Sequence, residues 1–380
     1  MTIWIIGIIF ICIMNLFDHK ISRRDFLKTG LFAAGLFTMK PWEQLSQLQY
    51  QWPDAEQLGR NCTGGVLTLR THPTINSAEI AKVYEDTVVV WLREVLGEAP
   101  NGVYSRRWVE TPNGYLFAPG VQPVKNTPNK PLAALPNSSM GPGFWAEVTV
   151  PYVDIKVEKD PCSFWLKNVK NPRLYYSQVL WIDSIKTDDQ SQVSYRVNEK
   201  YGNCGDLYWG AAEAFRPITA DEISPIHPDA ADKKVYIDLK HQVLSCFEGK
   251  DEVYFCRISS GAKYDAEGRA VDKYSTPVGQ HLPWEKDIST HMAGGSIGTG
   301  YDTAGISWTT LFDPQGAAIH STFWHNDFGT PRSHGCVNAR PEDAKWVFRW
   351  GLPSVSLDPG RVDISGPGGT VVEVVDQAAQ

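Results

Sequence analysis

The chain has 380 residues, of which 42% are hydrophobic, and a formal net charge of −7. This length and composition are typical of a globular protein with two or three domains. The acidic balance, with no basic run outside the N-terminal segment, argues against nucleic acid as a partner. Aromatic residues make up 12% of the chain, beside 32 Gly and 25 Pro, which favours a mainly β protein with many turns.

The first 40 residues have the pattern of an export leader. The run Ser22-Arg23-Arg24-Asp25-Phe26-Leu27-Lys28 precedes an apolar stretch, residues 30–39, and this order predicts a twin-arginine signal. A second apolar run, residues 3–13, is too short to span a bilayer, so we expect translation to start at Met14. Because no small-x-small cleavage site follows the leader, a processed form and a form tethered to the membrane both remain open.

Residues 60–130 contain short alternating runs separated by turn signals. Strands are expected at 66–70, 87–91, 107–110 and 114–117. The turn Pro112-Asn113-Gly114 joins the last two, because Asn-Gly tolerates positive φ. This region resembles a bacterial Src-homology-3-like small barrel.

A second β region follows a linker rich in Pro, Asn and Ser, residues 126–143. Residues 144–222 repeat the barrel pattern more faintly. The expected strands are 175–181, 193–197, 206–209 and 215–218. The alternative is that 60–222 forms one irregular β domain without a binding role.

The C-terminal region begins with strands expected at 235–239, 243–247 and 253–258. Residues 279–319 form a long polar and aromatic segment, which we expect to be a loop with His281 and His291 as ordinary loop histidines. Arg340-Pro341 and the acids after it predict a helix start. Residues 369–375 predict a closing strand.

One cysteine has the setting of a covalent nucleophile. Cys336 follows Gly335 and His334 just before the expected helix, and His320 ends an apolar run 16 residues upstream. The thiolate is the attacking species, so a neighbouring base must take the thiol proton. Spacing alone does not choose between His320 and His334 as that base.

Several ordered motifs resemble those of the L,D-transpeptidase catalytic-domain family. The signature is Ile319-His320-Ser321-Thr322 followed by the stretch 329–338. Upstream, segments 234–240 and 258–261 resemble the opening strand and the third strand of the family, and 275–279 resembles its Thr-Pro-x-Gly element. The resemblance covers residues 233–376. It implies a β-sandwich catalytic domain, preceded by one or two small β-barrels.

The resemblance also implies roles for residues around the cysteine. Cys336 would be the nucleophile and His320 the general base, with the main-chain carbonyl of Ser321 orienting the ring. His334 and Ser333 would support the loop, and N–H groups at Gly335 and Cys336 would form the oxyanion hole. The residues expected to contact substrate are Thr322, Asn338 and Arg340.

The implied function is that of a peptidoglycan L,D-transpeptidase, which cross-links stem peptides through a cysteine thioester in cell-wall biogenesis and the maintenance of cell shape. Export to the cell wall or periplasmic space fits this, because the substrate lies outside the cytoplasmic membrane. The expected partners are stem peptides, and no cofactor is expected. The alternatives are an L,D-carboxypeptidase that uses the same cysteine and a wall-binding protein with a weakly active catalytic domain.

The other thiols and the histidines allow two further interpretations. A metal site could use His320, His325, His334 and Cys336, but their spacing matches no familiar zinc pattern, so no metal is expected. Buried free thiols are the default expectation for the cysteines outside the leader and the motif. These are Cys62, Cys162, Cys204, Cys246 and Cys256.

Overall fold

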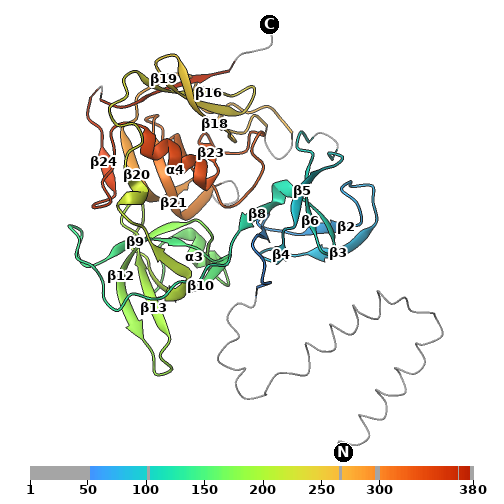
Figure 1. The fold of residues 1–380 in the computed structure, drawn as a ribbon, viewed down its shortest axis with the longest axis horizontal. Helices are drawn as coiled ribbons and strands as arrows, with labels where there is room; N and C mark the ends of the chain where they lie inside the picture. Colours follow the sequence, from blue (N-terminus) through green and yellow to red (C-terminus); the bar gives the residue numbers. More distant parts are fainter. Residues whose placement is uncertain (1–51, 101–102, 265–267, 296–299, 367, 377–380) are drawn as a thin grey trace, which may run out of the picture. The chain divides into compact units, whose positions relative to one another are not determined.

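The computed structural model describes residues 52–100, 103–264, 268–295, 300–366 and 368–376. The expected export leader, residues 1–40, and the expected start at Met14 lie outside these residues. Within the described part of the chain, no helix is both long and apolar enough to cross a membrane. The described residues are mainly strands (Figure 1).

The first β region forms a three-stranded sheet, in the order β4-β1-β8, and a five-stranded sheet, in the order β3-β2-β7-β6-β5. Strands β6 and β7 are joined by a turn at Pro112 and Asn113, within the expected turn segment, and Gly114, which begins β7, has φ +147°. The bounds are β1 Leu58–Asn61, β2 Leu67–Arg70, β3 Glu79–Val83, β4 Val88–Val90, β5 Arg93–Leu96, β6 Arg107–Thr111, β7 Gly114–Phe117, the 3₁₀ turn η1 Ala118–Gly120 and β8 Val121–Val124.

The second β region is one seven-stranded sheet with the order β11-β10-β14-β13-β12-β9-β15. The strand expected at 175–181 is divided, because Ser177 has φ +73° and turns the chain between β11 and β12. The bounds are β9 Phe144–Val148, β10 Tyr152–Val157, α3 Phe164–Asn168, β11 Arg173–Tyr175, β12 Val179–Thr187, β13 Val193–Asn198, β14 Leu207–Ala211, η2 Ala212–Ala214, β15 Phe215–Pro217 and η3 Asp221–Ile223.

The C-terminal region contains two five-stranded sheets, with the orders β18-β17-β16-β25-β19 and β23-β22-β21-β20-β24. The closing strand β25 pairs in parallel with β16. The bounds are β16 Lys233–Asp238, β17 Val243–Glu248, β18 Asp251–Arg257, β19 Gly279–His281, β20 Glu285–Gly294, β21 Tyr301–Leu311, β22 Ala318–Ser321, β23 Val337–Ala339, α4 Pro341–Trp350, β24 Arg361–Asp363 and β25 Val371–Val375.

Helix α4 lies between these two sheets (Figure 1). Pro341 is in its first turn and two acidic residues follow, as expected at a helix N-terminus. Val347 and Trp350 pack into a core with strands β16, β17 and β25. Phe348 packs into a second core with Trp308 of β21. The helix therefore fixes the segment immediately after Cys336 against both sheets.

Two expectations for this region are wrong. The segment 279–319 is not a loop, because β20 and β21 form a long antiparallel hairpin within it. Its small and polar residues are buried between layers, so the usual alternation of apolar and polar residues is weak. The stretch 258–261 is not a full strand either, since β18 ends at Arg257 and only isolated bridges follow.

The cysteines differ in part from the expectation. Cys162 and Cys204 form a disulfide, with Cα atoms 6.1 Å apart. Pairing cannot be deduced from sequence when the partners lie 42 residues apart without a framework spacing. The buried thiols of Cys62, Cys246 and Cys256 are free, as expected.

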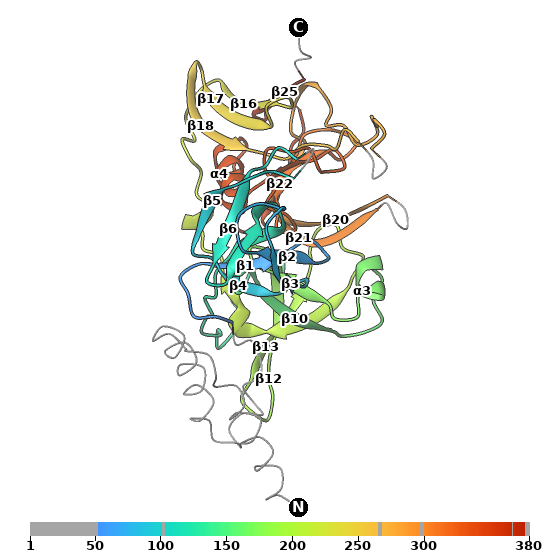
Figure 2. The same ribbon diagram turned by 90° about the vertical axis from the view of Figure 1, so that its right-hand side faces the viewer.

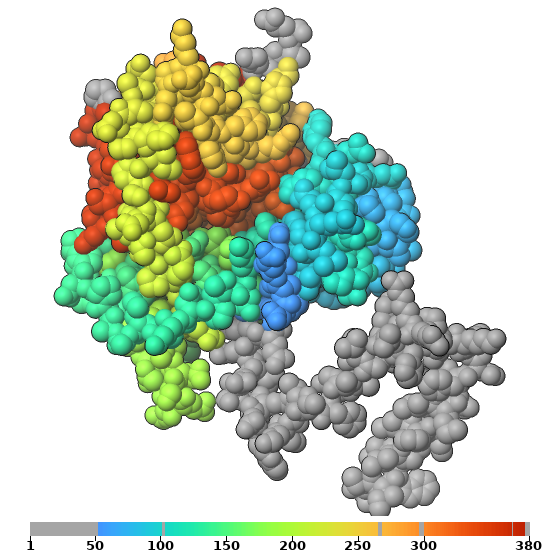
Figure 3. Space-filling view, viewed as in Figure 1, coloured from blue at the N-terminus to red at the C-terminus, as the bar shows by residue number. Residues whose placement is uncertain are grey.

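Both N-terminal β regions contact the C-terminal region directly. Figure 3 shows the first β region, in cyan, next to the orange surface of the C-terminal residues, where Arg60 Nη2 donates to the carbonyl of Phe323 at 2.9 Å. The second β region shares a hydrophobic core with the C-terminal region, because Trp145 and Trp181 belong to the same buried cluster as Trp308. The C-terminal region is thus packed against both.

Candidate active site

A cavity of about 330 Å³ contains most of the residues singled out in the sequence. It lies at the ends of β22 and β23 and beside the β20–β21 hairpin. Its lining residues are Met292, Tyr301, Thr303, Ile306, His320, Trp324, His325, Arg332, Ser333, His334, Cys336 and Asn338. A cavity with several converging polar groups is the expected form of a small-substrate site.

His320 lies on the buried strand β22, with a ring that is held in one orientation. Its Nδ1 atom is 2.8 Å from the main-chain oxygen of Ser321. Because a carbonyl oxygen can only accept, Nδ1 carries the proton of the neutral ring, and Nε2 keeps its lone pair. Burial lowers the pKa of His320 to about 4, partly offset by the hydrogen bond to Ser321. The ring is therefore a neutral base at pH 7.

Cys336 lies on the loop directly before β23, which pairs in parallel with β22. This pairing brings the chain segments of Cys336 and His320 to the same cavity. Burial of the sulfur raises the pKa of Cys336 to about 11, against the opposing effect of a backbone hydrogen bond at Ala318. The thiol lies 3.8 Å from the oxygen of Gly316, to which it donates weakly. It is protonated at pH 7.

The resting site therefore holds a neutral thiol and a neutral imidazole between about pH 4 and pH 11. A protonated thiol is a poor nucleophile, so attack requires transfer of its proton to a base during the reaction. His320, with a free lone pair on Nε2, has the chemistry of that base. Neither side chain of this pair carries a charge before substrate binds, which avoids the cost of burying an unpaired ion.

The loop before Cys336 is fixed by its own hydrogen bonds. Ser333 Oγ donates to the carbonyl of Cys336 and accepts the N–H of Gly335 at 3.1 Å. Gly335 has φ +120°, a conformation that favours glycine. The N–H of Gly335, expected in the oxyanion hole, is thus engaged by Ser333 in this structure. His334 packs between the rings of Tyr274 and Tyr301, at centroid distances of 4.5 and 5.4 Å.

Asn338 holds a second buried histidine beside the catalytic pair. The side-chain amide of Asn338 is 3.0 Å from Nε2 of His325, and His325 Nδ1 accepts the N–H of Asp327 at 3.1 Å. Because Nδ1 accepts, Nε2 carries the ring proton, and the Asn338 amide must present its oxygen to it. Burial, together with the nearby Arg332 and His320, lowers the pKa of His325 to about 3. His325 stays neutral and shapes the cavity wall.

Four expected site residues are not among those that line this cavity: Gly335, described above, and Ser321, Thr322 and Arg340. Ser321 Oγ turns away to Ser307 Oγ at 2.5 Å, although its carbonyl contacts His320. Thr322 is buried and lines a neighbouring cavity of about 210 Å³. Arg340 lines that second cavity too, with its guanidinium 5.5 Å from the ring centroid of Phe328.

Sequence reasoning missed much of the cavity wall. Tyr301, Met292 and Thr303 come from the hairpin that had been expected to be a loop, and no local pattern distinguishes their cavity-facing positions. The ring centroids of Trp324 and His320 are 5.9 Å apart, and Trp324 stands two residues after the motif that ends at Thr322. The available sequence signal for Trp324 as a site residue was that it is an aromatic residue within four positions of His320.

The described residues bring together one group of potential metal ligands, and it is not the set considered from the sequence. The single group of His, Cys, Asp and Glu side chains close enough to share an ion there is Cys162, Cys204 and Asp206. Its two sulfur atoms are bonded to each other, and it lies apart from the cavity-lining residues.

A comparison with protein families identifies the domain that contains this cavity. Residues 232–374 match the model of the L,D-transpeptidase catalytic domain, YkuD. The matched segment holds all of β16 to β24, α4 and most of β25. This part of the chain is therefore an L,D-transpeptidase catalytic domain. No curated protein matches the chain.

Solved structures similar to the chain include several L,D-transpeptidases. One crystal structure from Enterococcus faecium has 22% identity and a TM-score of 0.29, and the match covers 42% of this chain and 55% of that one. The NMR structure of the E. faecium catalytic domain has 23% identity, a TM-score of 0.28 and coverage of 38% and 97%. L,D-transpeptidase 3 from Mycobacterium tuberculosis has 14% identity, a TM-score of 0.29 and coverage of 52% and 92%. The chain thus spans only about half the length of the first of these proteins.

Proposed function

We propose that this protein is a peptidoglycan L,D-transpeptidase that works through a thioester on Cys336. The observation that carries the proposal is the pairing of a protonated thiol with a neutral histidine of fixed tautomer in one cavity. That cavity lies in a domain of the matching family. The substrate class is a peptide stem with a terminal D-amino acid, and no cofactor enters the reaction.

In the first half-reaction, the sulfur of Cys336 attacks the carbonyl carbon before the terminal D-Ala. Nε2 of His320 takes the thiol proton, and the Nδ1–H bond to the Ser321 carbonyl stabilises the resulting imidazolium. We assign the oxyanion contact to the main-chain N–H of Cys336, because that of Gly335 is already engaged. The carbon–nitrogen bond then breaks, and the proton on His320 passes to the leaving amine.

In the second half-reaction, an amine of a neighbouring stem attacks the thioester carbonyl. The now neutral His320 takes a proton from that amine, and the sulfur leaves and recovers a proton to restore the thiol. The new amide bond links two stems. Water in place of the amine would give the carboxypeptidase reaction instead.

The expected location follows from the substrate. Stem peptides lie outside the cytoplasmic membrane, so we propose export by the twin-arginine leader, to the cell wall or periplasmic space. In this proposal the two N-terminal β regions support the catalytic domain and face the wall polymer. The leader assignment is tested by replacing Arg23 and Arg24 with Lys in a strain that makes a fusion of the full chain. Loss of export would support the assignment.

Product analysis tests the activity. Purified protein without its leader is incubated with disaccharide-tetrapeptides, beside the Cys336→Ala variant and a Cys246→Ala variant. Cys246 is buried and free, so it is a matched control for removing a thiol. We expect cross-linked dimers from the wild type and the control, and none from Cys336→Ala. Release of D-Ala without dimers would replace the transpeptidase by a carboxypeptidase, and dimers from Cys336→Ala would refute the nucleophile.

A further inference from the structure

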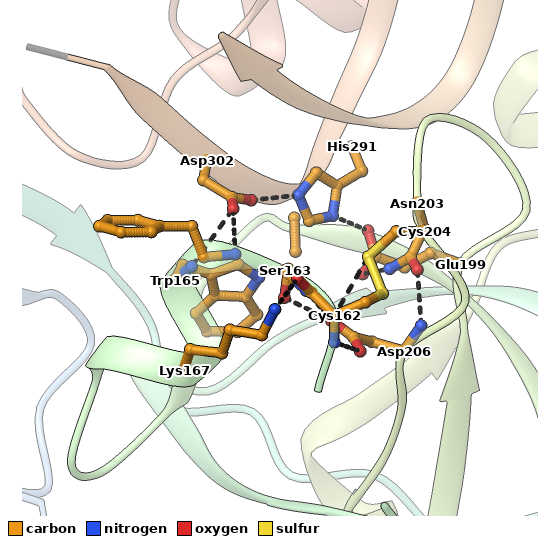
Figure 4. A network of polar contacts seen from close by, with 12 residues as sticks. Cys162, Ser163, Trp165, Lys167, Glu199, Asn203, Cys204, Asp206, His291 and Asp302 are labelled. Atoms are coloured by element: carbon orange, nitrogen blue, oxygen red, sulfur yellow. Dashed lines mark hydrogen bonds and ion pairs between the residues drawn. A yellow bond between two sulfur atoms is a disulfide. The ribbon is translucent and has the colours of Figure 1, made fainter. Parts of the chain in front are cut away.

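The hairpin of β20 and β21 has two faces with different partners. Met292, Tyr301 and Thr303 line the catalytic cavity. His291 and Asp302 alternate with them along the strands and point to the second β region, as Figure 4 shows for both. The register shifts by one residue between Thr290 and Met292, where two residues of β21 lie opposite His291, so His291 faces a bulge in β21.

His291 is held between two carboxylates. Its Nε2 is 2.5 Å from Oδ1 of Asp302, and its Nδ1 is 3.0 Å from Oε2 of Glu199. The side chains of His291 and Glu199 are only 3% and 4% exposed. Because both ring nitrogens face oxygens that accept, both carry protons and the ring is a cation. Burial opposes the charge, but Glu199 and Asp302 outweigh it and raise the pKa of His291 to about 9.

Both carboxylates are tied to the second β region. Oδ2 of Asp302 accepts the N–H groups of Phe164 and Trp165, at 2.7 and 3.2 Å, where α3 begins. The other oxygen of Glu199 accepts the hydroxyl of Tyr208 at 2.9 Å. Figure 2 shows the hairpin extending toward α3. Each carboxylate thus joins His291 to a different strand or helix of that region.

The receiving side of this contact is itself rigid. The disulfide of Cys162 and Cys204 ties together the two segments that contribute to it (Figure 4). Asp206 accepts the N–H groups of Cys162 and Ser163, at 2.7 and 3.0 Å. At Gly202 a Cβ atom would lie 2.0 Å from the main-chain oxygen of His291, so the two backbones are in direct contact. The hairpin therefore meets a fixed support.

We propose that His291 is a positioning residue for the proposed transpeptidase reaction, on which this inference rests. With Glu199 and Asp302 it forms a three-residue contact, the His291 clamp, which sets where the hairpin lies over the cavity. Asp302 is next in sequence to Tyr301, whose ring is 5.4 Å from that of His334. Because Asp302 and Tyr301 are neighbours in the sequence, a clamp that holds Asp302 also holds the ring of Tyr301 against the loop that carries Cys336. The second β region is then part of the active site.

The clamp makes a specific prediction for a neutral replacement. His291→Gln leaves two buried carboxylates facing an uncharged side chain, and their repulsion moves the hairpin away from its support. A wall displaced by about 1 Å is enough to lower a rate about 100-fold. The thiol and its base, on β22 and the following loop, are untouched. Substrate turnover should fall while the intrinsic reactivity of the thiol does not.

The experiment compares His291→Gln with the control His241→Gln, which removes an exposed His–Asp pair at 2.7 Å from the same domain. Three measurements are made at a temperature where circular dichroism shows each variant folded. They are kcat and KM with the disaccharide-tetrapeptide, the rate of Cys336 alkylation by iodoacetamide, and hydrogen exchange of peptides from β21. We expect kcat to fall about 10- to 100-fold, alkylation to stay within about twofold, and β21 to exchange at least about tenfold faster, with the control unchanged.

A double variant separates positioning from general stability. Adding Asp302→Asn to His291→Gln removes one of the two facing carboxylates and with it their repulsion, but it does not rebuild the contacts of the His291 clamp. It should therefore restore thermal stability without restoring kcat. Recovery of kcat together with stability would overturn the positioning role, as would wild-type kcat in His291→Gln. If the wild type makes no product, the proposed function fails separately, and the exchange rates decide: unchanged exchange of β21 in His291→Gln refutes the clamp, and faster exchange supports it.

Discussion

At the scale of single residues, the chemistry depends on how burial treats two side chains. Burial keeps Cys336 protonated and His320 unprotonated, so neither carries charge before substrate arrives. The carbonyl of Ser321 then decides which nitrogen of His320 is free to act. His334 is the alternative base suggested by sequence, and its ring packs between two tyrosines. The geometry favours a supporting role for it.

Replacement of His320 by alanine should lower kcat by about 10²- to 10⁴-fold, the range for loss of a general base. His334→Ala should be milder, since it removes an aromatic contact. Steady-state kinetics with the tetrapeptide donor, with His241→Ala as the control, measure both. Wild-type activity in His320→Ala would refute the assignment of the base.

The pH dependence of kcat/KM reports the state of His320 in the free enzyme. Because the protonated ring cannot accept the thiol proton, activity is present above its pKa and lost below it. We expect the acid limb to fall about tenfold per unit below about pH 4. An acid limb of kcat/KM centred near pH 6.5, about the ordinary pKa of histidine, would show that the buried ring is not the base.

At the scale of elements, the disulfide joins the segment before α3 to the segment between β13 and β14. Its partners are 42 residues apart. Removing both cysteines, as Cys162→Ala with Cys204→Ala, should lower the free energy of unfolding by about 4 kcal/mol from loop entropy. Urea denaturation measures this, with Cys62→Ala as the control for loss of a free thiol. An unchanged midpoint would mean that Asp206 and its hydrogen bonds hold the segment alone.

The sequence was sufficient for the elements whose signals are local. The motif around Cys336, the start of α4 at Pro341 and the turn at Pro112 and Asn113 all depend on neighbouring residues. The β20–β21 hairpin was missed because its buried small and polar side chains hide the two-residue period. His291 was then interpreted as a loop residue, although it is buried between carboxylates supplied by distant segments. Contacts between residues that lie far apart in the sequence cannot be recognised from a local sequence pattern.

At the scale of the whole molecule, three buried histidines make the free energy of unfolding depend on pH. Two of them and the third act in opposite directions. The pKa values of His320 and His325 are lowered to about 4 and about 3, so the unfolded chain binds more protons below pH 6.5. Stability is then lost as pH falls. The pKa of His291 is raised to about 9, so the stability it contributes is full below pH 6.5 and lost as pH rises to about 9.

The contribution of these three histidines to the free energy of unfolding should therefore be greatest near pH 6.5 and decline on both sides. Urea denaturation from about pH 4 to pH 9 measures the profile. In His291→Gln the alkaline decline should be smaller, while the acid decline remains. Identical alkaline slopes in the two proteins would show that His291 is not charged in the fold.

The most direct test of the account is the intact mass of the protein during turnover. Protein without its leader is mixed with a disaccharide-tetrapeptide, quenched in acid within seconds, and digested to locate any adduct. We predict an added mass equal to the donor less its terminal D-Ala, carried by the peptide that contains Cys336 and absent from Cys336→Ala. An adduct on another residue, or cross-linked product from Cys336→Ala, would contradict the thioester mechanism.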